Sequence, residues 1–294
     1  MDHRKFLSGL PAEVKADLTT TSDARGLRHL AGHAGAILLV GLLIGLRVPF
    51  WPLLLPVQGV LIVFLFTLEH ECTHRTPFRT PALSDWVGRS AGLLILLPFE
   101  WFRYFHLAHH RHTNIPGRDP ELATEKPATI ATWVWHVSGI PYWWAGARLL
   151  VRLCLGRERA DYLPEGALPR VTREARVMAA LYAAAALSLF ASPLVWSVWW
   201  APALIGMPAL RLYLLAEHGD CPFVANMFEN TRTTFTNRIV RALAWNMPYH
   251  VEHHVYPTVP FHRLADLHRI MRDELKVTAD GYASFTRDYL ARRR

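Results

Sequence analysis

Two pairs of apolar segments constrain the fold of this chain more than any other feature. The first pair covers residues 31–46 and 51–68, and the second covers residues 177–191 and 195–216. Each segment is close to the roughly 17 residues that a helix needs at minimum to cross a bilayer. The links RVPF and SPL allow little more than a turn, and their only charge is Arg47. We therefore predict two transmembrane helical hairpins.

The composition agrees with a membrane protein. Of 294 residues, 51% are hydrophobic and 19% are charged, whereas soluble domains have roughly 25% charged residues. The net charge of +8 comes from basic residues scattered among apolar segments, which favours contact with anionic lipid head groups over nucleic acid. Three cysteines without metal-type spacing predict no disulfide framework and fit a reducing compartment. The polar residues 1–28 predict no cleaved signal peptide.

Two other apolar segments are not expected to span. Residues 90–102 are too short and contain Pro98, which fits a re-entrant or interfacial segment. Residues 130–155 are aromatic and broken by Gly139 and Pro141, which predicts interfacial helices. The hairpin links contain one of the 32 Lys and Arg residues, one more lies within the last span, and the other segments contain the remaining 30. These other segments are therefore predicted to be cytoplasmic, with both termini inside.

Nine of the 16 histidines cluster on the predicted cytoplasmic side, and six of them lie just after apolar segments. They occur in HECTH, HLAHH and HVEHH and once after the fourth span, as His70, His74, His106, His109, His110, His218, His250, His253 and His254. Spacings of i, i+4 and i, i+3, i+4 bring each set to one face of a helix. A helix that only needs solubility has no reason for such a stripe, so we interpret these residues as metal ligands.

HECTH alone is the zinc metalloprotease motif, with Glu71 as general base. One zinc ion takes about four ligands in structural sites and three plus water in catalytic sites. Nine imidazoles are too many for one such ion and suit two ions with four or five nitrogens each. Imidazole binds several first-row metals, so the ligand type does not select iron. In such a cluster, Glu71 is better explained as an acceptor that orients an imidazole.

Asp119 and Glu252 can also accept hydrogen bonds from metal-bound imidazoles, although a role in a loop turn explains Asp119 equally well. His112 is either a spare ligand or, as we prefer, a hydrogen-bonding or surface residue. The histidines without cluster spacing are predicted to be structural; they are His29, His33, His136, His262 and His268.

With these three histidine motifs and two pairs of spans, the chain resembles the membrane fatty acid desaturase superfamily, the integral-membrane di-iron desaturases and hydroxylases. The flanks GRDPEL (residues 117–122) and HHVYPTVPFHRL (residues 253–264) are also similar. The resemblance covers residues 31–270. It implies an all-α integral-membrane fold with four transmembrane helices in two hairpins and a cytoplasmic helical cap that carries a histidine-rich di-metal site.

The expected organisation is a single desaturase-like domain over residues 1–294. Residues 1–30 form a cytoplasmic N-terminal segment, and residues 31–68 form the first hairpin. Residues 69–176 are cytoplasmic or interfacial and carry the first two histidine boxes. Residues 177–216 form the second hairpin, and residues 217–294 are cytoplasmic with the third box.

The resemblance implies that the nine histidines bind two iron ions and act catalytically through them. O2 is the co-substrate, and a separate ferredoxin-, rubredoxin- or cytochrome b5-like protein supplies electrons, since no fused cytochrome b5 domain is evident. The implied reaction introduces a double bond into a fatty-acyl or lipid chain. Two positions depart from patterns in the family. Leu214 replaces an asparagine that reaches iron through water in some relatives, and His250 replaces the glutamine of front-end desaturases.

Four alternatives stay open at this point. Within the family, they are a lipid hydroxylase and a desaturase of a small amino-acid-like metabolite. A zinc-dependent membrane hydrolase that uses His70, Glu71 and His74 belongs to a different class. A metal-dependent membrane receptor would not be an enzyme and would need neither O2 nor a reductant. The nine-histidine pattern disfavours the last two.

Overall fold

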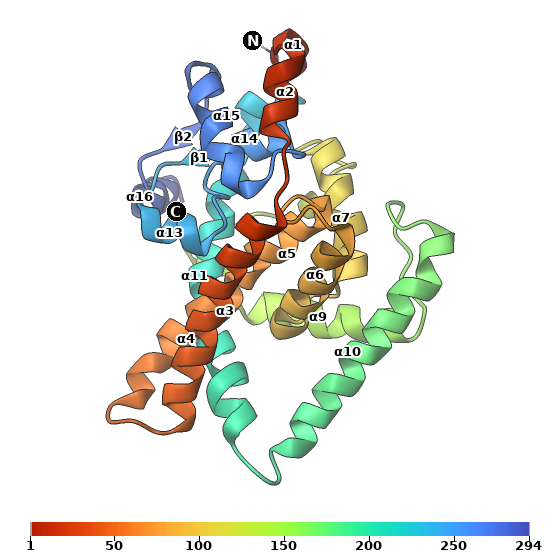
Figure 1. Cartoon of the computed structure of the whole chain (residues 1–294), viewed down its shortest axis with the longest axis vertical. Helices are drawn as coiled ribbons and strands as arrows, with labels where there is room; N and C mark the ends of the chain where they lie inside the picture. Colours follow the sequence, from red (N-terminus) through yellow and green to blue (C-terminus); the bar gives the residue numbers. More distant parts are fainter. Residues whose placement is uncertain (1, 294) are drawn as a thin grey trace.

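The structure is a computed structural model, and it describes residues 2–293. Within these residues the fold is helical except for one short parallel pair of strands, β1 (Thr233–Thr234) and β2 (Thr278–Ala279). Long helices extend from one end of the molecule, and shorter helices gather at the other end, where the N-terminus lies (Figure 1). The predicted all-α class is therefore confirmed.

The first predicted hairpin is present. Helix α3 (Asp23–Gly45) begins at Ser22, whose side chain accepts a hydrogen bond from the backbone N–H of Arg25. The chain turns at residues 46–50 and returns through η1 (Trp51–Leu53), α4 (Leu54–Val63) and α5 (Leu65–His74). Helices α3 and α4 lie side by side (Figure 1). The returning arm therefore ends on the first histidine motif.

The second hairpin consists of α10 (Leu168–Ser188), the π-helical turn η4 (Trp196–Trp200) and α11 (Ala201–His218). Helix α11 packs closely on α4 because two glycines face each other. A Cβ atom on Gly59 would lie 2.1 Å from the carbonyl oxygen of Pro202, and one on Gly206 would lie 2.2 Å from the carbonyl carbon of Gly59. Small residues allow such close helix contact within membranes. Helix α10 diverges from the other long helices (Figure 1).

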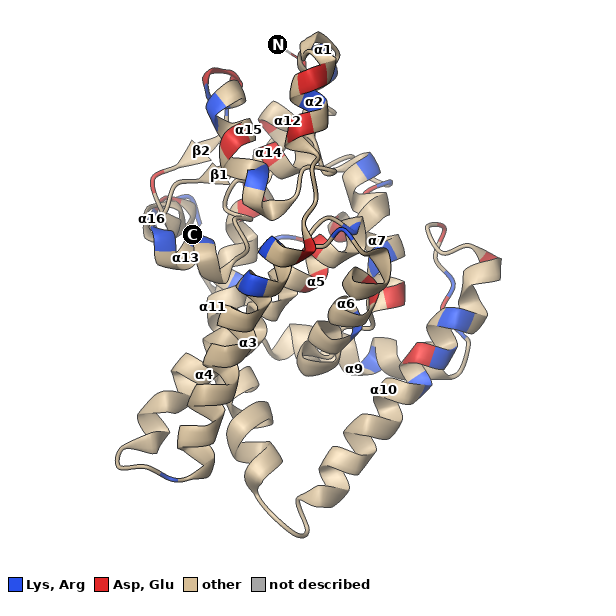
Figure 2. Cartoon of the chain, viewed as in Figure 1, with Lys and Arg blue, Asp and Glu red and all other residues tan. Residues whose placement is uncertain are grey.

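Three helical stretches are long and apolar enough to cross a membrane: Ala12–Gly45, Trp51–His74 and Trp196–His218. Helix α10 is not among them, because its first nine residues include four charged ones, Arg170, Arg173, Glu174 and Arg176. Three of the four predicted spans are thus supported. Charged residues are absent from the far ends of both hairpins apart from Arg47, and they lie toward the opposite end of the molecule (Figure 2).

The re-entrant or interfacial segment predicted at residues 90–102 is a helix, a turn and a second helix, and its position at the membrane surface stays a prediction. These residues form the end of α6 (Pro81–Ile95), a turn with Leu96 in the left-handed conformation, and the start of α7 (Phe99–His112). Pro98 is the N-cap of α7 and does not interrupt a helix. Residues 130–155 form two helices as predicted, α8 (Ile130–Val137) and α9 (Ile140–Cys154), with the break at Gly139.

The remaining helices lie at the polar end. They are α1 (His3–Gly9), α2 (Ala12–Leu18), η2 (Pro120–Ala123), η3 (Glu165–Ala167), α12 (Met227–Asn230), α13 (Arg238–Leu243), α14 (His250–Val255), η5 (Phe261–Arg263), α15 (Leu264–Met271), η6 (Arg272–Glu274) and α16 (Tyr282–Ala291). A buried apolar cluster that includes Phe228, Met247 and Leu264 contains Val251 and Val255 of α14. This packing fixes the helix that carries the third histidine motif.

Candidate metal centre

Four helices bring the nine predicted histidines together. The first group is His70 and His74 from α5, His106 and His110 from α7, and His253 from α14, and their potential ligand atoms lie within 4.8 Å of one another. The second group is His109, His218 and His254, also within 4.8 Å. His250 lies beside the second group, because its Nε2 is 3.1 Å from the Nε2 atoms of both His218 and His254. The nine histidines thus offer two sets of ligand nitrogens, five in the first group and four in the second group once His250 is counted with it.

Neighbouring histidines on one helix serve different groups. His109 and His110 are adjacent on α7, and His253 and His254 are adjacent on α14, yet each pair is split between the groups. Successive side chains on an α-helix point about 100° apart, whereas residues four apart share a face. Each motif therefore points all its histidines into one cluster, as predicted, but the i, i+4 pair of each motif belongs to one group and the third histidine of HLAHH and of HVEHH to the other.

The donor set fits metal ions. Both ring nitrogens of His110 and of His253, and Nε2 of His70, are buried without a hydrogen-bond partner. Buried polar atoms normally have a partner, because an unsatisfied one costs free energy. The Nε2 atoms of His74 and His106 lie 2.9 Å apart. Two nitrogens at roughly 2.0–2.1 Å from one ion, at right angles, would be about 3 Å apart.

The protonation states suit the same role. Burial, with help from neighbouring imidazoles, lowers the pKa of His106, His110 and His253 well below its ordinary value. They are neutral near pH 7, which is the form that binds metal. Burial also acts to lower the pKa of His109, but the carboxylates of Glu121 and Asp119 outweigh it and raise this pKa.

Each histidine of the second group has an oxygen atom beside its Nδ1. The carboxylate of Asp119 lies 2.9 Å from Nδ1 of His109 and also accepts hydrogen bonds from the backbone of its own loop, so both roles considered for Asp119 are present. The other three contacts join His218 to the carbonyl oxygen of Asn230 at 3.1 Å, His254 to Oγ1 of Thr113 at 3.1 Å, and His250 to a carboxylate oxygen of Glu217 at 3.4 Å. Acceptors at Nδ1 leave Nε2 free to face a metal. Sequence analysis missed Thr113, Glu217 and Asn230, because nothing in their spacing relates them to the histidines.

Glu71 supports the first group. Its Oε2 accepts hydrogen bonds from Oγ1 of Thr76 at 3.0 Å and from the backbone N–H of Phe261 at 3.1 Å, and its Oε1 lies 3.5 Å from Nδ1 of His253. The Glu71 side chain thus lies beside an imidazole of the first group, where the prediction places it, although the 3.5 Å separation is longer than an ordinary hydrogen bond.

The corresponding prediction for Glu252 was wrong. Its side chain accepts a hydrogen bond from Oγ1 of Thr233 at 2.5 Å and contacts His268, which lies outside both histidine groups. The Glu252 side chain extends from the side of α14 that faces away from the ligand atoms. It therefore helps to anchor the helix.

The other histidines lie outside the two groups. His29 and His33 contact the backbone oxygens of Ala242 and Leu61, and the remaining contacts join His136 to Arg211, His262 to Arg25 and His268 to Glu252. None of these five histidines belongs to either group, as predicted. His112 is half-buried and lines a cavity.

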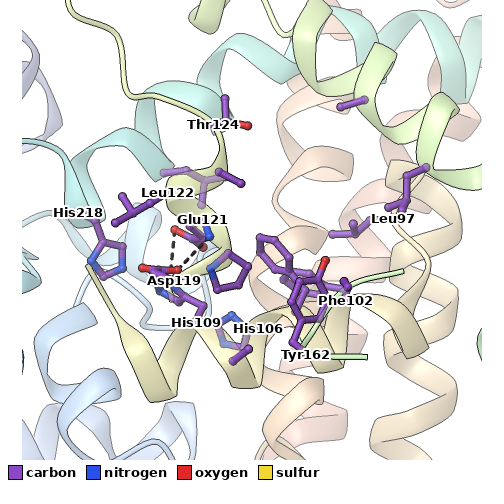
Figure 3. A pocket seen from close by; sticks show the side chains of 18 of the residues that line it. Leu97, Phe102, His106, His109, Asp119, Glu121, Leu122, Thr124, Tyr162 and His218 are labelled. Carbon is purple, nitrogen blue, oxygen red and sulfur yellow. Dashed lines mark hydrogen bonds and ion pairs between the residues drawn. The ribbon is translucent and has the colours of Figure 1, made fainter. Parts of the chain in front are cut away.

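That cavity has a volume of about 1130 Å³ and reaches both groups. Its walls come mainly from α7, α9, α11 and the loop that contains η2. Figure 3 shows the apolar side chains of Leu97 and Phe102 on one side of the cavity and His218 on the other, with His106 between them. An apolar chain can thus lie against the histidines.

Comparisons with known proteins agree with this geometry. The sequence profile described as "Fatty acid desaturase" matches residues 48–286. An sn-1 acyl-lipid omega-3 desaturase (ferredoxin) of Synechocystis is 22% identical, over 73% of this chain and 65% of that protein. An sn-1 oleoyl-lipid 12-desaturase of Picosynechococcus is 31% identical over 48% and 42%. A sphingolipid delta(4)-desaturase-like protein of Oryza sativa is 24% identical over 70% and 59%. The matches cover less than two thirds of these relatives.

Proposed function

The chain belongs to the fatty acid desaturase family, and on this premise we propose that it is an O2-dependent, di-iron membrane oxidoreductase of lipid metabolism. Its reaction is the introduction of a double bond into a fatty-acyl or lipid chain. The convergence of nine buried or half-buried histidines beside a partly apolar cavity carries this proposal. The five histidines of the first group would hold one iron ion, and the other four would hold the second.

When bound, the iron ions supply the oxidising power that cleaves an unactivated C–H bond with O2, which amino acid side chains cannot provide. The chain's own residues hold and orient this centre. Asp119 accepts a hydrogen bond from His109 of the second group, and Glu71 lies close to His253 of the first group. Leu97 and Phe102 shape an apolar wall that positions the reacting part of the substrate.

A separate electron-transfer protein completes the reaction. The name of the Synechocystis relative specifies ferredoxin as its donor, so a ferredoxin-like protein is our first choice, ahead of rubredoxin- or cytochrome b5-like proteins. We further propose that the part of α10 from residue 177 onward belongs to the fourth span and that the metal centre faces the cytoplasm. The support is the absence of charge from residues 177–210 and the concentration of basic residues at the opposite end.

Metal analysis tests the proposal first. The full chain, expressed with ample iron and purified in detergent, should contain about two irons per chain; one zinc and no iron would refute a di-iron centre. His106→Ala should abolish turnover and lower the metal content, whereas His262→Ala, which changes a histidine outside both groups, should retain both. Lipid analysis of expressing cells then separates a desaturase from a hydroxylase, because the two reactions share C–H cleavage but yield an alkene or an alcohol.

A further inference from the structure

Helix α11 places an arginine in the wall of the cavity. Arg211 and His218 are seven residues apart and both line the cavity. Seven residues are two helical turns, so the two residues share a face and lie about 10 Å apart along the axis. Arg211 also lies within the apolar stretch Trp196–His218. A charged residue inside a span is costly and usually serves a function.

Arg211 has no carboxylate partner among residues 2–293. Its Nη2 lies 3.1 Å from Nε2 of His136, and its Nε is buried without a hydrogen-bond partner. Burial, together with the charge of Arg211, lowers the pKa of His136 to about 4, so this imidazole is neutral near pH 7. Its contact does not balance the charge of the guanidinium.

Acidic residues line the same cavity but contact other groups: Glu121 lies 3.8 Å from Nδ1 of His109, and Glu217 lies 3.4 Å from Nδ1 of His250. Leu214 and Leu149 line the same cavity, and the hydroxyl of Tyr142 already donates to the carbonyl oxygen of Ile95 at 2.8 Å. A guanidinium has five N–H donors and pairs best with a carboxylate or phosphate, which can accept two of them side by side. The cavity therefore places apolar side chains beside a buried guanidinium that forms no ion pair with a carboxylate among the described residues.

We propose that Arg211 binds an anionic end group of the substrate, so that the enzyme acts on an amphiphilic acid in preference to a chain with an uncharged end. This inference rests on the proposed function, because it assumes that the cavity holds the substrate. An anion at Arg211, two helical turns from His218, places the reacting carbon several bonds away from the charged end. The anion is either the carboxylate of a free acid or the phosphate of a head group.

Binding measurements test this without turnover. The full chain in amphipol is titrated with octanoate, octyl phosphate and methyl octanoate. At least one anion should bind roughly tenfold or more tightly than the ester, because loss of a buried charge pair costs at least that factor. Preference for octanoate identifies a free acid, and preference for octyl phosphate identifies a phosphorylated head group.

Variants locate the anion. In Arg211→Gln the ratio of anion affinity to ester affinity should fall to near one. Arg211→Lys, which keeps the charge and guards against a folding defect, should retain part of the preference. Arg118→Gln changes an exposed arginine at the cavity and should retain all of it. Equal binding of anions and ester by the wild type, preference that survives in Arg211→Gln, or loss of preference in Arg118→Gln would overturn the inference.

Metal content separates this test from that of the proposed function. An iron-loaded protein without anion preference would overturn the role of Arg211 and leave the di-iron proposal intact. A protein that prefers anions but holds no iron would support the anion site and overturn the di-iron proposal.

Discussion

Replacing Asp119 with asparagine should weaken the binding of one metal ion and leave the affinity for the other unchanged. The carboxylate accepts hydrogen bonds from Nδ1 of His109 at 2.9 Å and from the backbone N–H groups of Asn114 at 2.7 Å and Glu121 at 2.9 Å. His109 belongs to the second group, so the first group does not depend directly on this carboxylate. An asparagine amide has one acceptor oxygen and places an NH2 group where the other oxygen was.

At least one of the three donors must then lose its acceptor. A hydrogen bond to a charged group contributes about 1.5–3 kcal/mol. Loss of a partner that orients a metal-bound histidine typically lowers metal affinity about 10–100-fold, which is about 1.4–2.7 kcal/mol. The two ranges overlap. The ion held by His109, His218, His250 and His254 should therefore bind about 10–100-fold more weakly, while the other ion keeps its affinity.

Anaerobic titration of metal-free protein with Fe(II) and a competing chelator measures the two affinities. The wild type should bind two ions tightly, and Asp119→Asn should bind one tightly and one weakly. Asp273→Asn is the matched control, because this side chain is 91% exposed. Two ions with unchanged affinity in Asp119→Asn, or equal weakening of both, would refute the assignment of His109 to a separate ion.

Three further predictions address the rest of the structure. Glu71→Gln should weaken mainly the binding of the ion at the first group, because Glu71 lies beside His253. The same iron titration checks this. Gly206→Ala should lower the unfolding temperature in detergent, because the new Cβ would clash with α4, whereas Gly35→Ala, with nothing within 4 Å, should not. Burial raises the pKa of Glu174 to about 7, so the folded state favours the protonated acid, and stability should be greatest at low pH and fall as pH rises through about 7. Glu174→Gln should flatten this dependence in melting curves recorded from about pH 5 to 8; an unchanged slope would contradict it.

Local patterns in the sequence determined the hairpins and the identity of the clustered histidines. Apolar runs with short, nearly uncharged links lead directly to paired helices, since their length and composition suffice. The i, i+4 spacing of His70 and His74 brings both side chains to one face of a helix whatever surrounds it. The exception is α10, where the charged residues before position 177 leave too short an apolar stretch to qualify as a span.

Only the tertiary structure decided how the histidines divide between two groups. His109 and His110 are neighbours in the chain, but His109 lies against His218 of α11 and His110 lies against His74 of α5, so each joins a different group. The same packing brings Glu71 to His253 and directs Glu252 away from the ligand atoms, although both are glutamates next to a histidine in a motif. Spacing along a helix sets which side a residue faces, but the contacts it makes depend on which helices pack against that side.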